Sequence, residues 1–174
     1  MRVLATAVLL ACSYGSGSVA LEWKAARTLE RSSLEAVQHE AAALTIFAPD
    51  GIQIRLSPAE IEALGSHRLT THTPWRDVPA TFDGALLTDI LEMAGLGTDA
   101  AIEVTAENDY TVVIEQRLLD SIPILVVTRV NGKPHTRRAR GPIQFVMDME
   151  DYEASDLAAE RHWVWMAAEI RVAR

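Results

Sequence analysis

Short segments in which apolar and polar residues alternate recur along the chain, a pattern typical of β-strands with one buried face. Leu44 to Ala48 and Ile52 to Leu56 flank a Pro-Asp-Gly turn, which predicts a hairpin. Asn131-Gly132 follows a continuous apolar segment and predicts a second tight turn. The predicted strands, in chain order, cover residues 44–48, 52–56, 67–73, 101–106, 110–115, 124–130, 143–147 and 163–172.

Apolar residues at helical spacing predict short helices between these strands. Gly84 to Ala94 carries its leucines and isoleucine on one face, and Gly95 ends the segment. Ser57-Pro58-Ala59-Glu60 is a capping box that predicts a helix to about Leu64, and residues 116–121 form one further helical turn. Helices and antiparallel strands are interspersed without a regular βαβ rhythm, so the predicted fold class is α+β.

Two segments have a weaker pattern. Residues 73–81 contain two prolines and are predicted as a loop. Residues 23–43 are rich in alanine and glutamate and carry only a thin apolar stripe, which predicts a helix. We therefore expect residues 21–43 to be a helical extension in front of a single domain formed by residues 44–174.

The first twenty residues have the pattern of an export signal. Arg2 supplies a positive charge, Val3 to Ala11 is apolar, and Ser18-Val19-Ala20 fits a cleavage site after Ala20. We therefore expect residues 1–20 to be a signal peptide and the mature protein to be exported, to the periplasm. Two alternatives stay open, a lipoprotein attached through Cys12 in the lipobox-like Leu9-Leu10-Ala11-Cys12 and a buried N-terminal helix.

Charge and cysteine content narrow the classes of function. The formal net charge is −8, so the protein would repel the phosphates of nucleic acid, and we expect no nucleic-acid partner. Cys12 is the only cysteine in the sequence, so an exported chain cleaved after Ala20 has no disulfide and depends on its hydrophobic core.

From Leu44 onward, several short motifs occur in the order of one known family. The ordered set resembles the molybdopterin-binding domain of the sulfite oxidase family, and most closely its small exported members that keep this fold as a single domain. The resemblance implies a sulfite-oxidase-type fold with a mixed sheet and short helices over residues 44–174. The motifs are Thr70-Thr71-His72-Thr73-Pro74-Trp75, Phe82-Asp83-Gly84-Ala85-Leu86-Leu87, Asn108-Asp109-Tyr110, Val130-Asn131-Gly132-Lys133-Pro134, Arg140-Gly141-Pro142-Ile143 and Trp163-Val164-Trp165.

The resemblance also bears on activity. Enzymes of the family bind molybdenum through a cysteine thiolate that lies near the positions held here by Thr71 and His72, and neither residue is a soft thiolate ligand. The small exported relatives include proteins that bind a pterin without metal and report it to a membrane-bound sensor of cyclic-dinucleotide metabolism. The resemblance thus implies an exported binding protein for a pterin or molybdopterin-like ligand, without a metal and without molybdenum catalysis.

Two other functions are compatible with the same residues. One is a molybdopterin-dependent oxidoreductase in which a group other than cysteine binds the metal. The other is an interaction protein whose pocket no longer binds a ligand. His67 and His72 do not favour a shared metal, because a spacing of five along a strand puts them on opposite faces.

A pterin is a flat polar ring, which requires an aromatic face for stacking and a few hydrogen bonds in the ring plane. Trp75 follows a proline and Trp165 alternates with Val164, so both are candidates for stacking, with a place in the core as the alternative. Asp109 is a candidate acceptor for the ligand's N–H groups and Tyr110 a neighbouring contact, unless Asn108-Asp109-Tyr110 is only a turn.

Charged residues gather in two further segments. The basic cluster of residues 133–140 is either a solvated loop or a surface that binds an anionic group of the ligand or of a partner. In the second case, Arg138 is the candidate residue that contacts this anionic group. The acidic residues between 150 and 160 are expected to form a solvated loop or, alternatively, a lid or partner contact. No catalytic or metal-binding residue is predicted. The predicted ligand-binding residues are Thr71, His72, Trp75, Asn108, Asp109, Tyr110, Arg138 and Trp165.

Overall fold

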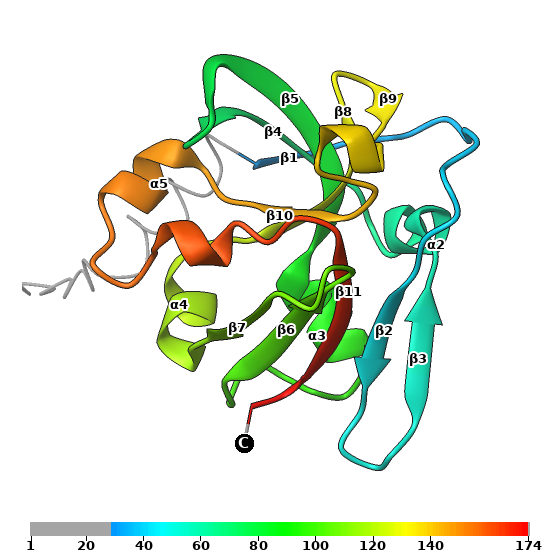
Figure 1. The fold of residues 1–174 in the computed structure, drawn as a ribbon, viewed down its shortest axis with the longest axis vertical. Helices are drawn as coiled ribbons and strands as arrows, with labels where there is room; N and C mark the ends of the chain where they lie inside the picture. Colours follow the sequence, from blue (N-terminus) through cyan, green and yellow to red (C-terminus); the bar gives the residue numbers. More distant parts are fainter. Residues whose placement is uncertain (1–28, 174) are drawn as a thin grey trace, which may run out of the picture.

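Two β-sheets form the framework of the protein, whose computed structural model describes residues 29–173 (Figure 1). Their strands and the short helices around them confirm the predicted α+β class. The first sheet has the order β1-β4-β5-β8-β10, with β9 paired to β8. Its strands are β1 (Leu29–Arg31), β4 (His67–Thr73), β5 (Arg76–Leu86), β8 (Leu125–Val130), β9 (Lys133–Pro134) and β10 (Gln144–Val146).

The second sheet has the order β3-β2-β11-β6-β7. Its strand β11 runs parallel to β2 and antiparallel to β6, so the sheet is mixed. The hairpin predicted after Ala48 is formed, and the two strands predicted on either side of Asn108 also pair antiparallel in this sheet. Its strands are β2 (Leu44–Phe47), β3 (Gln53–Leu56), β6 (Ile102–Ala106), β7 (Thr111–Ile114) and β11 (Ala167–Val172).

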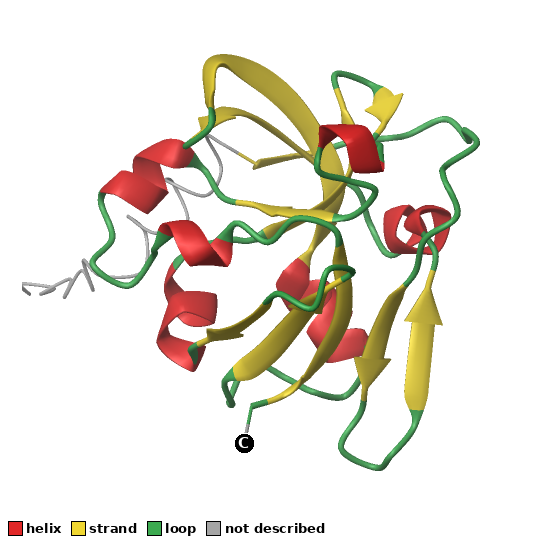
Figure 2. Ribbon diagram, viewed as in Figure 1, coloured by secondary structure: helices red, strands yellow, loops and turns green. Residues whose placement is uncertain are grey.

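Short helices lie between and around the sheets (Figure 2). The capping box predicted at Ser57 is present, because its Oγ accepts a hydrogen bond from Glu60 N at 3.3 Å and Glu60 Oε2 accepts one from Ser57 N at 2.7 Å. Gly95 follows the end of α3 with a φ of 70°. The helices are α2 (Pro58–Ala63), α3 (Leu87–Met93), α4 (Gln116–Ser121), α5 (Met149–Glu153) and the 3₁₀ turns η1 (Arg137–Ala139) and η2 (Glu160–His162).

One hydrophobic core contains residues of both sheets and of α3. The strands of the second sheet contribute alternate residues, as the sequence pattern predicts, with Leu44 and Ile46 of β2 fully buried. Gly84 lies where β5 approaches β8, and a Cβ at this position would stand 2.0 Å from Val126 O. Only glycine permits this close approach of the two strands.

The structure corrects the predicted loop at residues 73–81. Strand β5 begins at Arg76 and pairs with β4, so Pro74 and Trp75 form the turn of a hairpin. Proline is tolerated at position 79 because β5 pairs with β8 only from Phe82 onward, which leaves one side of β5 without a partner strand there. The next helix starts at Leu87 instead of Gly84, since residues 84–86 pair with β8.

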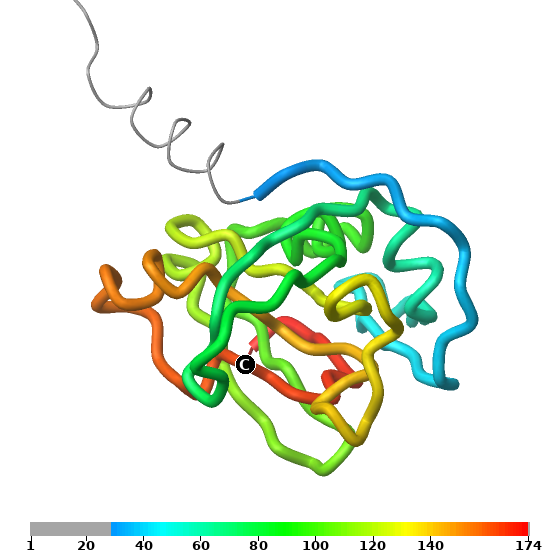
Figure 3. The backbone as a smooth tube through the Cα atoms, turned by 90° about the horizontal axis from the view of Figure 1, so that it is seen from above, coloured from blue at the N-terminus to red at the C-terminus, as the bar shows by residue number. Residues whose placement is uncertain are grey.

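The predicted helix over residues 23–43 is also wrong in its described part. Leu29–Arg31 form β1 along β4, and residues 32–43, here called the arm, are irregular and run along the outside of the domain (blue in Figure 3). Arg129 Nη2 donates a hydrogen bond to Glu35 O at 2.7 Å, and Arg137 Nη2 donates one to Ala41 O at 2.9 Å. These tertiary contacts hold an irregular backbone where the weak apolar stripe favoured a helix.

The predicted signal peptide, residues 1–20, lies outside the described residues, as does the lipobox with Cys12. Among the helices of residues 29–173, none combines the length and the apolar character that crossing a membrane requires.

A buried ion pair joins α2 to the first sheet. Arg129 donates hydrogen bonds to Glu62 Oε1 at 2.8 Å and Oε2 at 2.6 Å, and Thr128 Oγ1 donates to Oε1 at 2.7 Å. Burial alone would raise the pKa of Glu62, but these hydrogen bonds and the charges of His39 and Arg129 lower it below its ordinary value. The carboxylate therefore stays ionised and fixes α2 and the arm against β8.

Candidate functional site

Three tryptophan side chains from two distant segments meet beside one cavity. Trp75 comes from the β4–β5 turn, and Trp163 and Trp165 come from the segment between η2 and β11. The ring centroid of Trp75 lies 4.6 Å from that of Trp165 and 6.4 Å from that of Trp163, both in edge-to-face arrangements. The cavity, called the tryptophan cavity below, has a volume of about 430 Å³ and is lined by Trp75, Asn108, Tyr110, Glu160, Arg161, Trp163, Trp165 and Met166.

The three indoles differ in how far they are exposed. Trp163 is buried in the core, where Tyr152 contacts it edge-to-face at 5.5 Å. Trp75 and Trp165 are half-buried, so their rings form the wall that a bound molecule can reach. Within residues 29–173, neither Trp163 Nε1 nor Trp165 Nε1 has a hydrogen-bond partner, whereas Trp75 Nε1 donates to Glu160 Oε1 at 3.0 Å.

Arg140 packs against the two half-buried indoles without lining the cavity. Its Cζ lies 4.3 Å from the ring centroid of Trp165 and 5.3 Å from that of Trp75. A guanidinium at these distances is attracted to the electron-rich ring faces. Arg140 therefore fixes the orientation of both rings and leaves the cavity open.

Strained backbone gathers around the same cavity. Asp109, Arg140 and Met166 have positive φ values of 64°, 82° and 51°, which aspartate tolerates in a turn but which are unfavourable for arginine and methionine. Hydrogen bonds between their segments hold them, from Met166 N to Arg140 O at 3.2 Å and from Glu107 N to Met166 O at 2.8 Å. Strain of this kind collects at binding and catalytic sites, where the surrounding structure enforces it.

Tyr110 and the η2 segment close one side of the cavity. The Tyr110 hydroxyl donates a hydrogen bond to Arg161 O at 3.2 Å, and Asn108 Oδ1 accepts one from Tyr110 N at 3.3 Å. His162 Nδ1 accepts a hydrogen bond from Ala159 N at 3.1 Å. Burial and the nearby charge of Arg161 lower the pKa of His162 to about 4, so this imidazole is neutral at neutral pH.

The structure brings together half of the residues predicted as ligand-binding. Trp75, Asn108, Tyr110 and Trp165 come from three separate segments and line the tryptophan cavity. The strand predicted over residues 163–172 is wrong at its start, because β11 begins only at Ala167 and both Trp163 and Trp165 lie before it. The irregular backbone before β11 buries one indole and leaves the other half-exposed.

The other predicted residues lie outside the lining of the cavity. Thr71 is buried in β4, and its Oγ1 accepts a hydrogen bond from Met149 N at 3.0 Å, while His72 lies on the exposed face of the same strand. Asp109 is exposed at the tip of the β6–β7 turn, and Arg138 is exposed in η1. Asp109 therefore does not supply the carboxylate at the cavity, and another acid does.

That acid is Glu160, which the sequence placed in an acidic loop. Its Oε1 reaches Trp75 although the two residues are 85 positions apart in the chain. Arg161 and Met166 also line the cavity without having been predicted. Their closeness in sequence to the motif that contains Trp163 and Trp165 could have indicated Glu160 and Arg161 as lining residues.

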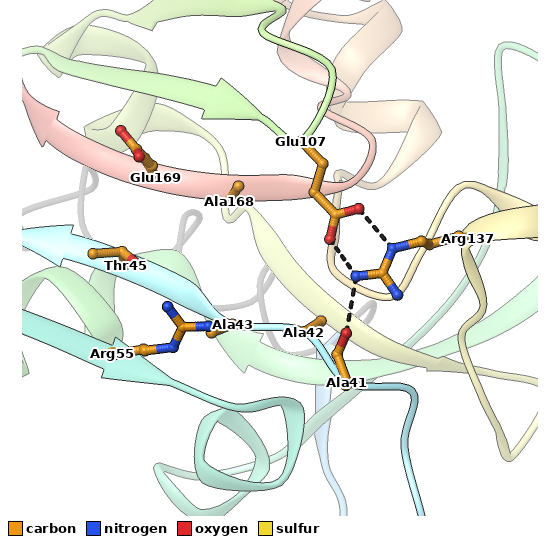
Figure 4. Close-up of a pocket in the computed structure, with 9 residues that line it drawn as sticks. All are labelled: Ala41, Ala42, Ala43, Thr45, Arg55, Glu107, Arg137, Ala168 and Glu169. Carbon is orange, nitrogen blue, oxygen red and sulfur yellow. Dashed lines mark hydrogen bonds and ion pairs between the residues drawn. The ribbon is translucent and has the colours of Figure 1, made fainter.

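A second cavity of about 430 Å³ lies between the arm, β2 and β11 (Figure 4). Arg137 donates two hydrogen bonds to Glu107, from Nε to Oε2 and from Nη2 to Oε1, both at 2.7 Å. Four alanines and Thr45 form much of its wall, and it has no aromatic lining residue. Arg137 and Glu107 are thus already paired with each other, and the second cavity offers no surface on which a flat ring could stack.

Within residues 29–173, no group of three or more histidine, cysteine or acidic side chains is arranged to hold a metal ion. Comparison with protein-family models and with curated proteins finds no match to this chain.

Proposed function

We propose that this protein binds a pterin or a closely related flat heterocycle in the tryptophan cavity and acts as a binding protein. The observation that carries the proposal is the pair of half-buried indoles, Trp75 and Trp165, which Arg140 holds at the wall of a largely apolar cavity. Small-molecule sites have this character, with an apolar and aromatic lining and a few polar groups that orient the ligand. Here those polar groups are Glu160, Arg161 and the neighbouring amide of Asn108.

The proposal includes the fold and the cellular setting implied by the sequence motifs. A sulfite-oxidase-type domain is compatible with the two sheets, one of them mixed, and with the short helices between them. The motifs around Trp75, Tyr110 and Trp165 lie far apart in the sequence but meet at the cavity, which supports a common role. We propose further that the exported protein reports ligand binding to the periplasmic domain of a membrane-bound sensor.

The placement of Thr71 and His72 favours binding over molybdenum chemistry. Molybdenum in related enzymes requires a thiolate near these positions, and neither side chain supplies one. The Thr71 hydroxyl already accepts a hydrogen bond from Met149 N, and His72 points to the opposite face of β4. These two residues do not fit a shared metal centre, so we derive no step through molybdenum.

The test is a titration of the protein that begins after Ala20 with a pterin, followed by quenching of tryptophan fluorescence and by calorimetry. We expect saturable binding of one pterin to one chain. A nucleoside such as adenosine serves as a control for unspecific stacking. Absence of saturable pterin binding would contradict the proposed ligand class, and stoichiometric molybdenum in protein purified from its native compartment would contradict the non-catalytic function.

A further inference from the structure

We propose that Glu160 determines which heterocycle the tryptophan cavity accepts, by selecting a ring edge that carries adjacent N–H donors. This inference rests on the proposed function and makes it more specific. The ligand class is a 2-amino-4-oxo heterocycle, such as a pterin, in preference to its 2,4-dioxo counterpart, a lumazine.

The hydrogen bonding of Glu160, an exposed residue that lines the cavity, leaves one of its carboxylate oxygens without a partner in the described part of the chain. Its Oε1 accepts the hydrogen bond from Trp75 Nε1 at 3.0 Å. Within residues 29–173, no hydrogen bond or ion pair engages its Oε2. An ionised carboxylate has about four acceptor positions and no donor, so Glu160 can accept further N–H groups but repels oxygen atoms.

The position of Glu160 relative to the indoles ties edge recognition to stacking. Its hydrogen bond places the carboxylate at the edge of the Trp75 ring, and both residues line the same cavity. A flat molecule stacked on Trp75 would therefore present its own edge near this carboxylate. The amino group at C2 and the neighbouring ring N–H of a pterin form a donor pair that matches two carboxylate oxygens.

Arg161 at the same cavity supports the preference of Glu160 for a pterin over a lumazine. Arg161 lines the same cavity and supplies only donors, so it suits the 4-oxo group that lies next to the N–H edge. Asp109, the acid first expected to bind the ligand, is exposed on a turn and does not line the cavity. In a lumazine, an oxygen replaces the 2-amino group and would face the Glu160 carboxylate, which is unfavourable.

The experiment compares pterin and lumazine affinities in the wild type, in Glu160→Gln and in Glu153→Gln, with the protein that begins after Ala20. The glutamine keeps an oxygen for the Trp75 N–H but loses the charge and one acceptor, so stacking is preserved. Hydrogen bonds to a charged group carry enough energy that we expect pterin to bind about ten- to a hundredfold more weakly to Glu160→Gln. Lumazine should bind with nearly unchanged or improved affinity.

Glu153→Gln is the matched control, because Glu153 is an exposed acid of α5 outside the cavity and its loss changes the net charge equally. It should keep the wild-type preference for pterin. The ratio of the two affinities within one preparation does not depend on the fraction of folded protein, so partial unfolding of a variant cannot imitate the effect.

The outcomes separate the two proposals. A wild type that binds neither ring overturns the pterin function and, with it, the role of Glu160. A wild type that binds pterin and lumazine equally overturns the selectivity while the cavity keeps its function. An equal loss of both ligands in Glu160→Gln would mean that this residue only positions Trp75, which also overturns the selectivity.

Discussion

Replacing Trp75 by alanine tests whether its indole forms the stacking surface. Trp75 packs edge-to-face against Trp165 at 4.6 Å and more loosely against Trp163 at 6.4 Å. Aromatic pairs contribute about 0.5–1.5 kcal/mol each beyond the area that they bury. Together with the loss of a half-buried ring, we expect Trp75→Ala to lower the free energy of unfolding by about 2–3 kcal/mol.

The effect on binding is separate from this loss of stability. Stacking of a bound heterocycle on an aromatic side chain is worth about 1–3 kcal/mol, by analogy with base stacking. Trp75→Ala should therefore weaken pterin binding by roughly ten- to a hundredfold while the protein stays folded. Trp75→Phe keeps a stacking face but cannot donate to Glu160, so it should retain more of the affinity than the alanine variant.

The assay is a pair of measurements on each variant, a calorimetric titration with pterin and a thermal melt. Val78→Ala is the matched control, because Val78 lies in the same β4–β5 hairpin, is 70% exposed and does not line the cavity. It should change neither quantity. Unchanged affinity of Trp75→Ala together with a large fall in Tm would show that this ring serves the core and that the ligand binds elsewhere.

Three further predictions concern stability and processing. Gly84→Ala places a methyl group 2.0 Å from a backbone oxygen of β8, so urea unfolding should show a loss of about 3 kcal/mol or more, and a wild-type midpoint would contradict the close approach. The folded-state pKa of Glu62 is lowered from 4.5, so its pairing with Arg129 stabilises the protein above about pH 4.5 and is lost as the pH falls through the folded-state pKa. Urea unfolding between pH 3 and 7 should therefore show stability declining with acid, whereas Glu62→Gln should be less stable at pH 7 and show a shallower decline. Intact mass of the exported protein should correspond to a chain that begins after Ala20, and a mass that begins at a lipidated Cys12 would identify a lipoprotein.

Local signals in the sequence were sufficient for most of the secondary structure. The capping box at Ser57 and the turn at Asn131 depend on neighbours within a few residues, and both are formed. The alternating segments are strands for the same reason, because the period of two decides which face of a strand is buried. The α+β class follows from the order of such elements.

The sequence pattern failed where distant contacts override local preference. The arm favours a helix by composition, yet hydrogen bonds from Arg129 and Arg137 hold it in an irregular path along the domain. Strand β5 continues through a proline because its neighbour β8 is absent at that point. In both places the deciding partner lies far away in the chain, where no short-range pattern can indicate it.

For the candidate site, too, the sequence indicated types of residue, whereas the tertiary structure decided which residues meet. The sequence pointed to Trp75, Tyr110 and Trp165 because aromatic side chains suit a flat ring, and to Asn108 as part of the motif that contains Asp109 and Tyr110. Their convergence on one cavity, and the replacement of Asp109 by Glu160 as its carboxylate, depend on how the β4–β5 turn meets the η2 segment. That meeting is set by the packing of two sheets on a shared core, and residues 85 positions apart become neighbours only when that core has formed.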